Sequence, residues 1–184
     1  MLACGFVREE LSSRGIAPDA GEPPLLTPFG TLPDGCCAEA LHRQAELFGL
    51  SLIGPQAVYG GSEPEDAGEG EAVGLLRATF LAARLGCRRV LWPASGAVGG
   101  GLDLDRIAAI SDSALLVGRL VGLRSAWHGV PGIRVETPFV DLTDRQMADL
   151  IEDMALPLEA CWWWRSDRAG EGERRRWTAL RTGV

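Results

Sequence analysis

The stretch IRVETPFVDLT, Ile133–Thr143, decides the fold. Its β-branched residues predict a strand, which Pro138 interrupts because proline cannot donate a hydrogen bond to a neighbouring strand. Asp141 and Thr143 supply the short polar side chains that cap a helix, which we expect over 144–154. A strand that leads directly into a helix is the repeating unit of a parallel α/β sheet.

The same alternation extends outward along the chain. Apolar residues at spacings of three and four predict helices, and Gly49 and Gly86 stand where C-caps are expected. Gly99-Gly100-Gly101 is expected to open a helix that Asp103 or Asp105 caps and that runs to 121. The other expected helices are 2–16, 36–49, 72–85, 144–154 and 173–182, and the expected strands are 25–29, 50–53, 88–92 and 133–140.

This order of elements predicts one α/β domain, 1–184, with a doubly wound parallel sheet and helices on both faces. Residues 60–71 combine glycine, proline and acidic residues without periodicity, so we expect a surface loop there. Residues 157–170 are irregular and rich in tryptophan.

The basic residues of the chain are peculiar. All 18 are arginine among 184 residues, and there is neither lysine nor asparagine. A Walker A loop, a Schiff base and pyridoxal phosphate all need a lysine, and N-glycosylation needs an asparagine. These chemistries are therefore excluded. A GC-rich genome accounts for missing surface lysines, but less well for a missing catalytic one.

Net charge and cysteine content further limit the class of protein to which the chain can belong. The net charge of −7 argues against binding to a nucleic-acid backbone. No apolar stretch reaches the roughly 20 residues that cross a bilayer, and no targeting segment is recognised, so we expect a cytoplasmic protein without a membrane partner. Five cysteines without a C-x-x-C pair favour reduced, mostly buried thiols.

Two segments carry a family resemblance: ETPFVDLT, Glu136–Thr143, and LPLEACW, Leu156–Trp162. They resemble the C-terminal part of the 7-cyano-7-deazaguanine synthases, queuosine-pathway enzymes of the PP-loop ATP pyrophosphatase superfamily. The similarity covers 35–182 and is strongest over 133–162. It implies a Rossmann-like, adenine-nucleotide-hydrolase type of sheet, a structural zinc, and an ATP-dependent ligase that converts 7-carboxy-7-deazaguanine and ammonia into a nitrile.

The chain departs from that family where phosphate would be held. The family begins with an S-G-G-x-D-S loop, and Met1 falls just after its position, so either the loop is lost or the recorded start is late. The Arg-Asn pair that enters the family's central helix matches Gly70 and Glu71. The lysine that follows D-L-T in the family is Asp144 here, which reverses the charge.

The resemblance also fails at the zinc ligands. The family's first zinc cysteine matches Trp164, and its C-x-x-C-x-x-C tail matches 173–180, which has no cysteine. Cys161 matches a threonine of the family. We therefore expect no zinc, and we expect Trp162–Trp164 to replace the metal by packing. The alternative is that these tryptophans form a contact for a protein partner or a second copy.

One internal stretch keeps nucleotide binding open. Ser95–Asp103 follows a strand and leads into a helix, as a PP-loop does, although the family register places it on the substrate loop. A glycine-rich turn at the carboxyl end of a strand is a ligand site in doubly wound sheets. The candidate binding residues are Ser95, Gly96, Gly99, Gly100, Gly101, Asp103, Glu136, Asp141 and Thr143. No catalytic residue and no metal ligand are assigned.

Three hypotheses follow. The first is a non-catalytic relative of the deazaguanine synthases that binds a purine-like small molecule or a protein partner. The second is an active ATP-dependent ligase of the queuosine pathway whose recorded start is late. The third is a module that binds a nucleotide such as ATP at Ser95–Asp103 without hydrolysing it. None of them involves direct contact with nucleic acid.

Overall fold

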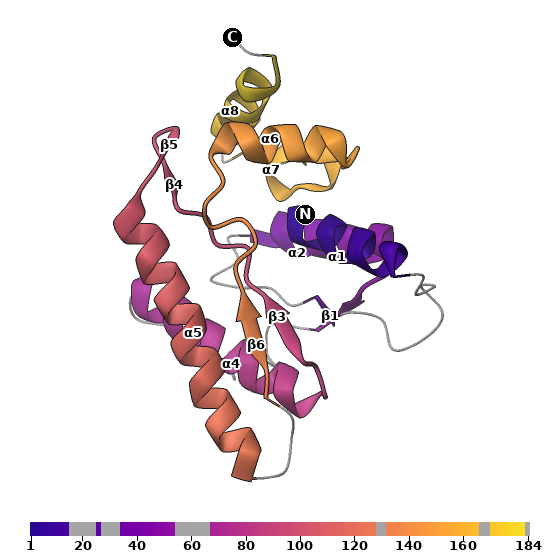
Figure 1. Ribbon diagram of the computed structural model, residues 1–184. Helices are drawn as coiled ribbons and strands as arrows, with labels where there is room; N and C mark the ends of the chain where they lie inside the picture. Colours follow the sequence, from indigo (N-terminus) through magenta and orange to yellow (C-terminus); the bar gives the residue numbers. More distant parts are fainter. Residues whose placement is uncertain (15–24, 27–33, 54–66, 128–131, 166–169, 183–184) are drawn as a thin grey trace. The chain divides into compact units, whose positions relative to one another are not determined.

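A computed structural model describes residues 1–14, 25–26, 34–53, 67–127, 132–165 and 170–182 (Figure 1). Contacts between residues divide the chain into two compact units. The terminal unit comprises Met1–Pro28, Leu32–Ile53 and Asp144–Val184, and the central unit comprises Phe29–Thr31 and Gly54–Thr143. Among the described residues, no helix has the length and apolar character that a membrane span requires.

The central unit contains a parallel strand pair. β3 (Arg89–Leu91) pairs with β6 (Arg134–Glu136), with Val90 opposite Val135. The long helix α5 (Leu104–Trp127) lies between these strands in the sequence and packs along β6, as a parallel crossover requires. Helix α4 (Ala67–Arg84) packs against α5. This strand-helix-strand unit is what the sequence pattern predicts for an α/β protein.

The core of the central unit lies between α4, α5 and one face of the strand pair. Val121 of α5 is fully buried and packs with Ala83 of α4 and with Ile133. A second cluster joins Leu75 of α4 to Trp92, which follows β3. Because side chains alternate along a strand, Val90 and Val135 face the helices, and Arg89 and Glu136 lie on the opposite face.

A β-hairpin stands between β3 and α5. β4 (Ala97–Val98) pairs antiparallel with β5 (Gly101–Leu102) through the two-residue turn Gly99-Gly100. Both turn residues have positive φ, 59° and 88°, which a two-residue hairpin turn favours and which glycine adopts without strain. The expectation that these glycines open a helix is therefore wrong, since α5 begins only at Leu104.

The terminal unit is mostly helical. α1 (Leu2–Ser13) packs against α2 (Asp34–Phe48), and α6 (Asp144–Asp153) packs against α8 (Glu171–Thr182). A second parallel pair joins β1 (Leu25–Leu26) to β2 (Ser51–Leu52), with α2 between them in the sequence. The 3₁₀ helix η1 (Leu158–Ala160) and α7 (Trp162–Arg165) follow α6. The buried cluster of the terminal unit consists of Ile151, Leu158 and Trp163.

Three of the described helices end in the same backbone motif. After α2, Leu50 N–H donates to the carbonyl of Ala45, and after α4, Cys87 N–H donates to that of Ala82. The residue before each donor, Gly49 or Gly86, has positive φ, as the sequence predicted for C-caps. The third motif follows α6, where Ala155 takes φ 48° without being glycine.

The structure agrees with some of the other expectations from the sequence and differs from others. The helices expected over 2–16, 36–49, 144–154 and 173–182 correspond to α1, α2, α6 and α8, although residues 15 and 16 lie outside the described residues. Residues 67–71 belong to α4 rather than to a surface loop, since acidic residues stabilise a first turn, and 60–66 lie outside the described residues. Among the described residues each sheet has only two strands, so the doubly wound parallel sheet stays a prediction.

Candidate functional site

The predicted binding residues gather on two segments of the central unit. Residues 92–103 follow β3 and residues 137–143 follow β6; we call them the carboxyl-end loops. Because β3 and β6 are parallel, both loops leave the same edge of the pair, where ligands bind in open α/β sheets. The N–H of Gly96 donates to the carbonyl of Val140 at 2.9 Å, so the structure joins the two loops directly.

Gly96 is needed where the loops meet. A Cβ atom at this position would stand 2.7 Å from the carbonyl oxygen of Val140 and would overlap the side chain of Ile107. Only glycine permits so close an approach of the two backbones. This glycine therefore holds the loops together, and its backbone N–H is already bonded within the chain.

Ser95 and Asp103 form the base of the hairpin. The Ser95 Oγ accepts a hydrogen bond from the N–H of Ala97 at 3.1 Å, and the Ser95 carbonyl accepts one from Nε of Arg106 at 3.0 Å. Asp103 Oδ1 accepts from the N–H of Arg106 at 3.0 Å and thereby caps α5. Of the two expected capping residues, Asp103 is thus the one that caps.

The amino end of α5 consequently carries a carboxylate of its own. Backbone N–H groups at a helix start attract phosphate when they are open to a ligand. Here Asp103 occupies that position, and the neighbouring Asp105 is exposed. Arg106 is the nearby cation, and its Nε is bonded to the Ser95 carbonyl. These groups do not fit a triphosphate.

Glu136 lies at the end of β6 and forms an ion pair across the strands. Nε of Arg89 donates to Oε1 at 3.1 Å, and Nη2 donates to Oε2 at 2.6 Å. This two-pronged arrangement fixes both side chains in one plane. Each side chain nevertheless remains about a third exposed, 29% for Arg89 and 33% for Glu136. The Glu136 carboxylate therefore stays accessible to a ligand as an acceptor.

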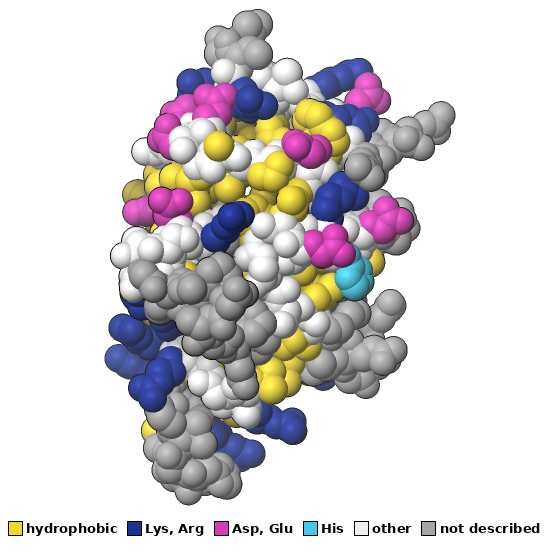
Figure 2. Space-filling model, turned by 90° about the vertical axis from the view of Figure 1, so that its right-hand side faces the viewer, with side chains coloured by type: hydrophobic (Ala, Val, Ile, Leu, Met, Phe, Trp, Pro, Cys, Tyr) yellow, Lys and Arg dark blue, Asp and Glu magenta, His cyan; other side chains and the backbone are white. Residues whose placement is uncertain are grey.

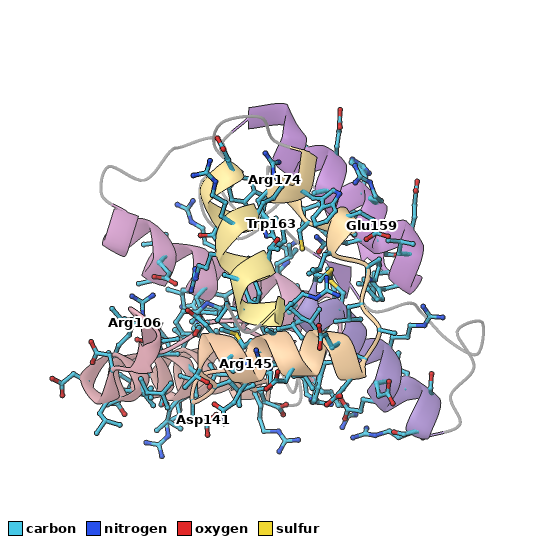
Figure 3. The ribbon with its side chains drawn as sticks, turned by 90° about the horizontal axis from the view of Figure 1, so that it is seen from above. Arg106, Asp141, Arg145, Glu159, Trp163 and Arg174 are labelled. Atoms are coloured by element: carbon cyan, nitrogen blue, oxygen red, sulfur yellow. The ribbon has the colours of Figure 1, made fainter. Side chains whose placement is uncertain are left out.

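The remaining candidates lie on the second loop. Asp141 is exposed and Thr143 is half-buried directly before α6. Figure 3 shows Asp141 and Arg106 as separate side chains of the central unit, on different segments. The loop backbone is ordered by its own turns, with Val140 N–H bonded to the Thr137 carbonyl. Their role in binding stays a prediction.

Around Trp163 and Trp164 the terminal unit has aromatic packing. The Trp163 ring stacks on that of Trp177, with centroids 6.4 Å apart and planes 5° apart. Trp163 is 7% exposed, and Trp164 is 41% exposed. Arg174 donates to the carbonyls of Trp163 and Trp164 at 2.8 Å each (Figure 3). Packing is thus the role of Trp163, as expected from the sequence.

A metal does not fit these positions. Tryptophan side chains offer no zinc ligand, and zinc needs thiolate, imidazole or carboxylate groups. Among the residues that the structure describes, no group of three or more His, Cys, Asp or Glu side chains is arranged to hold a metal ion. The stacked rings and the Arg174 hydrogen bonds fasten the segment instead.

Asp144 is part of the fold of the terminal unit. Its Oδ2 accepts a hydrogen bond from Nη2 of Arg176 on α8, and its side chain is 7% exposed. Arg176 also lies over the Trp177 ring, 5.9 Å from its centroid. The hydrogen bond from Arg176 to Asp144 raises the pKa of Arg176 above its ordinary value.

A hollow that the sequence did not indicate lies in the terminal unit. Its volume is about 250 Å³, and α1, the end of α2 and the turn after α6 line it. Phe48, Met154 and Leu156 supply apolar walls, and Arg8 and Glu9 lie on α1. These residues come from three distant segments, so no local motif reveals them.

Figure 2 shows one face of the molecule, on which acidic, basic and apolar side chains are interspersed. Comparison with protein-family models, with curated proteins and with solved structures gives no match for this chain.

Proposed function

We propose that this chain is a non-catalytic, cytosolic binding protein built on an α/β scaffold similar to that of the 7-cyano-7-deazaguanine synthases. Its ligand is a purine-like small molecule at the carboxyl-end loops. The resemblance over Glu136–Thr143 and Leu156–Trp162 supports the scaffold. The altered phosphate and zinc positions support the loss of catalysis.

The buried Asp144–Arg176 pair is the observation that carries this proposal. In the resembling enzymes the matching residue is a lysine, whose charge suits phosphate. Here the residue is an acid that is 7% exposed and bonded to an arginine of α8. An acid so placed contributes to folding, and the position no longer supplies a cation for phosphate.

The amino end of α5 supports the same proposal. The glycine-rich stretch that resembles a phosphate loop forms a hairpin, and the Asp103 carboxylate caps the helix that follows. A neutral heterocycle does not meet the repulsion that a phosphate would meet there. Glu136 offers a carboxylate acceptor that suits the edge of a purine-like base.

A turnover assay tests the loss of catalysis. The chain is incubated with ATP, magnesium, ammonium and 7-carboxy-7-deazaguanine, and AMP and pyrophosphate are measured. We expect no AMP above the protein-free blank and substoichiometric zinc by elemental analysis. AMP formation that depends on the deazaguanine, or one zinc per chain, would overturn the proposal.

Titration calorimetry tests the ligand. We expect heats with 7-deazaguanine bases and none with ATP or AMP. Glu136→Gln should weaken base binding, because the amide loses a carboxylate acceptor and its pairing with Arg89. Glu39→Gln, at an exposed residue of α2 in the terminal unit, is the matched control. Heats with ATP and none with the bases would favour the nucleotide-binding module instead.

A further inference from the structure

Helix α5 carries apolar side chains on two of its sides. One side packs into the core of the central unit. The side chains on that side are Ile110, Ala114, Val117 and Val121. On the other side Leu116, Leu120 and Leu123 are 63%, 48% and 66% exposed. Leucines exposed to this degree on one helix are unusual for a surface and mark a contact site.

The three leucines form a seam. Their spacing of four and then three residues places them on one stripe of the helix, as in helices that pair with another helix. We call Leu116, Leu120 and Leu123 the outer seam. Leu115 beside it is also half-exposed, at 50%.

Charges beside the outer seam indicate which partner binds α5, namely a second copy of this chain. Asp112 and Arg119 are both exposed and stand seven residues apart, so they lie on the same flank of the seam. If two α5 helices paired in parallel and in register, Asp112 of one copy would face Asp112 of the other, and Arg119 would face Arg119. In an antiparallel pair centred between residues 115 and 116, Asp112 of each copy lies opposite Arg119 of the other. Helix α5 is thus complementary to a second copy of itself in one orientation.

The same register also matches large side chains to small ones. It places Leu123 of one copy over Ala108 and Ala109 of the other, both of which are exposed. Leucine over alanine lets two helices approach without overlap, which favours close packing.

We infer that α5 is the dimer interface of this protein, at which two α5 helices pair antiparallel about a two-fold axis, so that the outer seam of each copy lies against residues 108–115 of the other. Such an interface is isologous, so each contact occurs twice. The surface is distinct from the carboxyl-end loops and from Trp162–Trp164.

Sedimentation velocity of the full chain, from low to high micromolar concentration, tests this inference. We expect a dimer in the wild type. Leu116→Glu and Leu123→Glu should weaken association about a hundredfold or more, because each introduces its charge twice into an apolar contact. Circular dichroism checks that the variants fold. Leu85→Glu, at a leucine 46% exposed after α4, should leave the dimer intact.

A charge exchange separates the antiparallel pair from any other arrangement. Asp112→Arg and Arg119→Asp should each weaken the dimer, since each places like charges opposite one another, and the double variant should restore it. A wild type that is monomeric at every concentration would overturn the inference. A double variant no better than either single one would overturn the antiparallel register, whether or not the leucine variants dissociate.

Discussion

Asp144 at the start of α6 and Arg176 on α8, 32 residues apart, are joined by an ion pair in which the carboxylate is almost fully buried. The pair fastens two helices of the terminal unit, whose residues Ile151 of α6 and Trp177 of α8 also contribute to one hydrophobic cluster. It also places an anion at the first turn of α6, where the helix dipole favours negative charge. Asp144 thus stabilises the fold both through the ion pair and through its charge at the helix start.

Asp144→Lys, the residue found in the resembling enzymes, should destabilise the protein by about 2–4 kcal/mol, because an ammonium would face Arg176 in a buried position. Asp144→Asn should lower stability less, by about 1–2 kcal/mol, since Arg176 is 45% exposed and water screens it. Urea unfolding followed by tryptophan fluorescence measures both. Adding Arg176→Glu to Asp144→Lys should recover part of the loss. Equal effects of lysine and asparagine would contradict the role of the ion pair.

The Trp163–Trp177 stack should stabilise the terminal unit. We expect Trp177→Ala to lower the free energy of unfolding by about 2–3 kcal/mol, because it removes a ring that covers buried Trp163. Trp164→Ala is the matched control and should lower it by less than about 1 kcal/mol, since Trp164 is 41% exposed. The same urea titration, followed by circular dichroism, compares the two. A larger effect at Trp164 would show that the exposed ring carries the packing.

Local patterns in the sequence account for much of this fold. Apolar spacing predicts α2 and α6, and Gly49 and Gly86 mark helix ends because positive φ favours glycine. The turn after α6 shows the limit of this reasoning. Ala155 adopts the same backbone shape, but an alanine carries no sequence signal for it. There the backbone follows from tertiary packing.

The candidate site was harder to predict, because its decisive contacts join distant segments. The glycines of 99–101 suit a helix entrance and a hairpin equally, and only the pairing of β4 with β5 decides between them. The bond from Gly96 to Val140 and the partner of Asp144 link residues far apart in sequence. No spacing rule predicts such partners, whereas the Asp103 cap is local and was predictable.

Gly96 should tolerate no side chain. Gly96→Ala places a Cβ 2.7 Å from the Val140 carbonyl and against Ile107, so we expect a loss of about 2–3 kcal/mol and weaker ligand binding at the carboxyl-end loops. Gly101→Ala meets open space and should change stability by less than about 0.5 kcal/mol. Thermal unfolding and calorimetry compare the variants. A neutral Gly96→Ala would mean that the two loops do not approach so closely.

Ala155→Gly should stabilise the protein. Ala155 holds φ 48° at the end of α6, a conformation that glycine adopts without steric strain. We expect a gain of about 0.5–1 kcal/mol, which the greater freedom of glycine in the unfolded chain keeps small. Ala109→Gly, on the exposed side of α5, should instead lose about 1 kcal/mol. Denaturant midpoints of the two variants should therefore move in opposite directions.

Stability should fall in mild alkali because of Cys161. Burial raises the pKa of its thiol from 9.0 to about 11. Between these values the unfolded chain loses the thiol proton while the folded chain keeps it, so rising pH favours unfolding. The loss begins near the ordinary pKa and reaches about 3 kcal/mol above the raised one. No lysine titrates in this window, which leaves the thiol contribution visible.

Urea unfolding at closely spaced pH values from neutral to alkaline measures this slope. Cys161→Ala should flatten it, and burial likewise raises the pKa of Cys4, so Cys4→Ala should remove a further part. Iodoacetamide gives an independent readout, because only the thiolate reacts: Cys161 should be alkylated slowly in the folded protein and rapidly in urea. An unchanged slope in Cys161→Ala, together with fast labelling of Cys161 in the native protein, would show that this thiol is not desolvated in the fold.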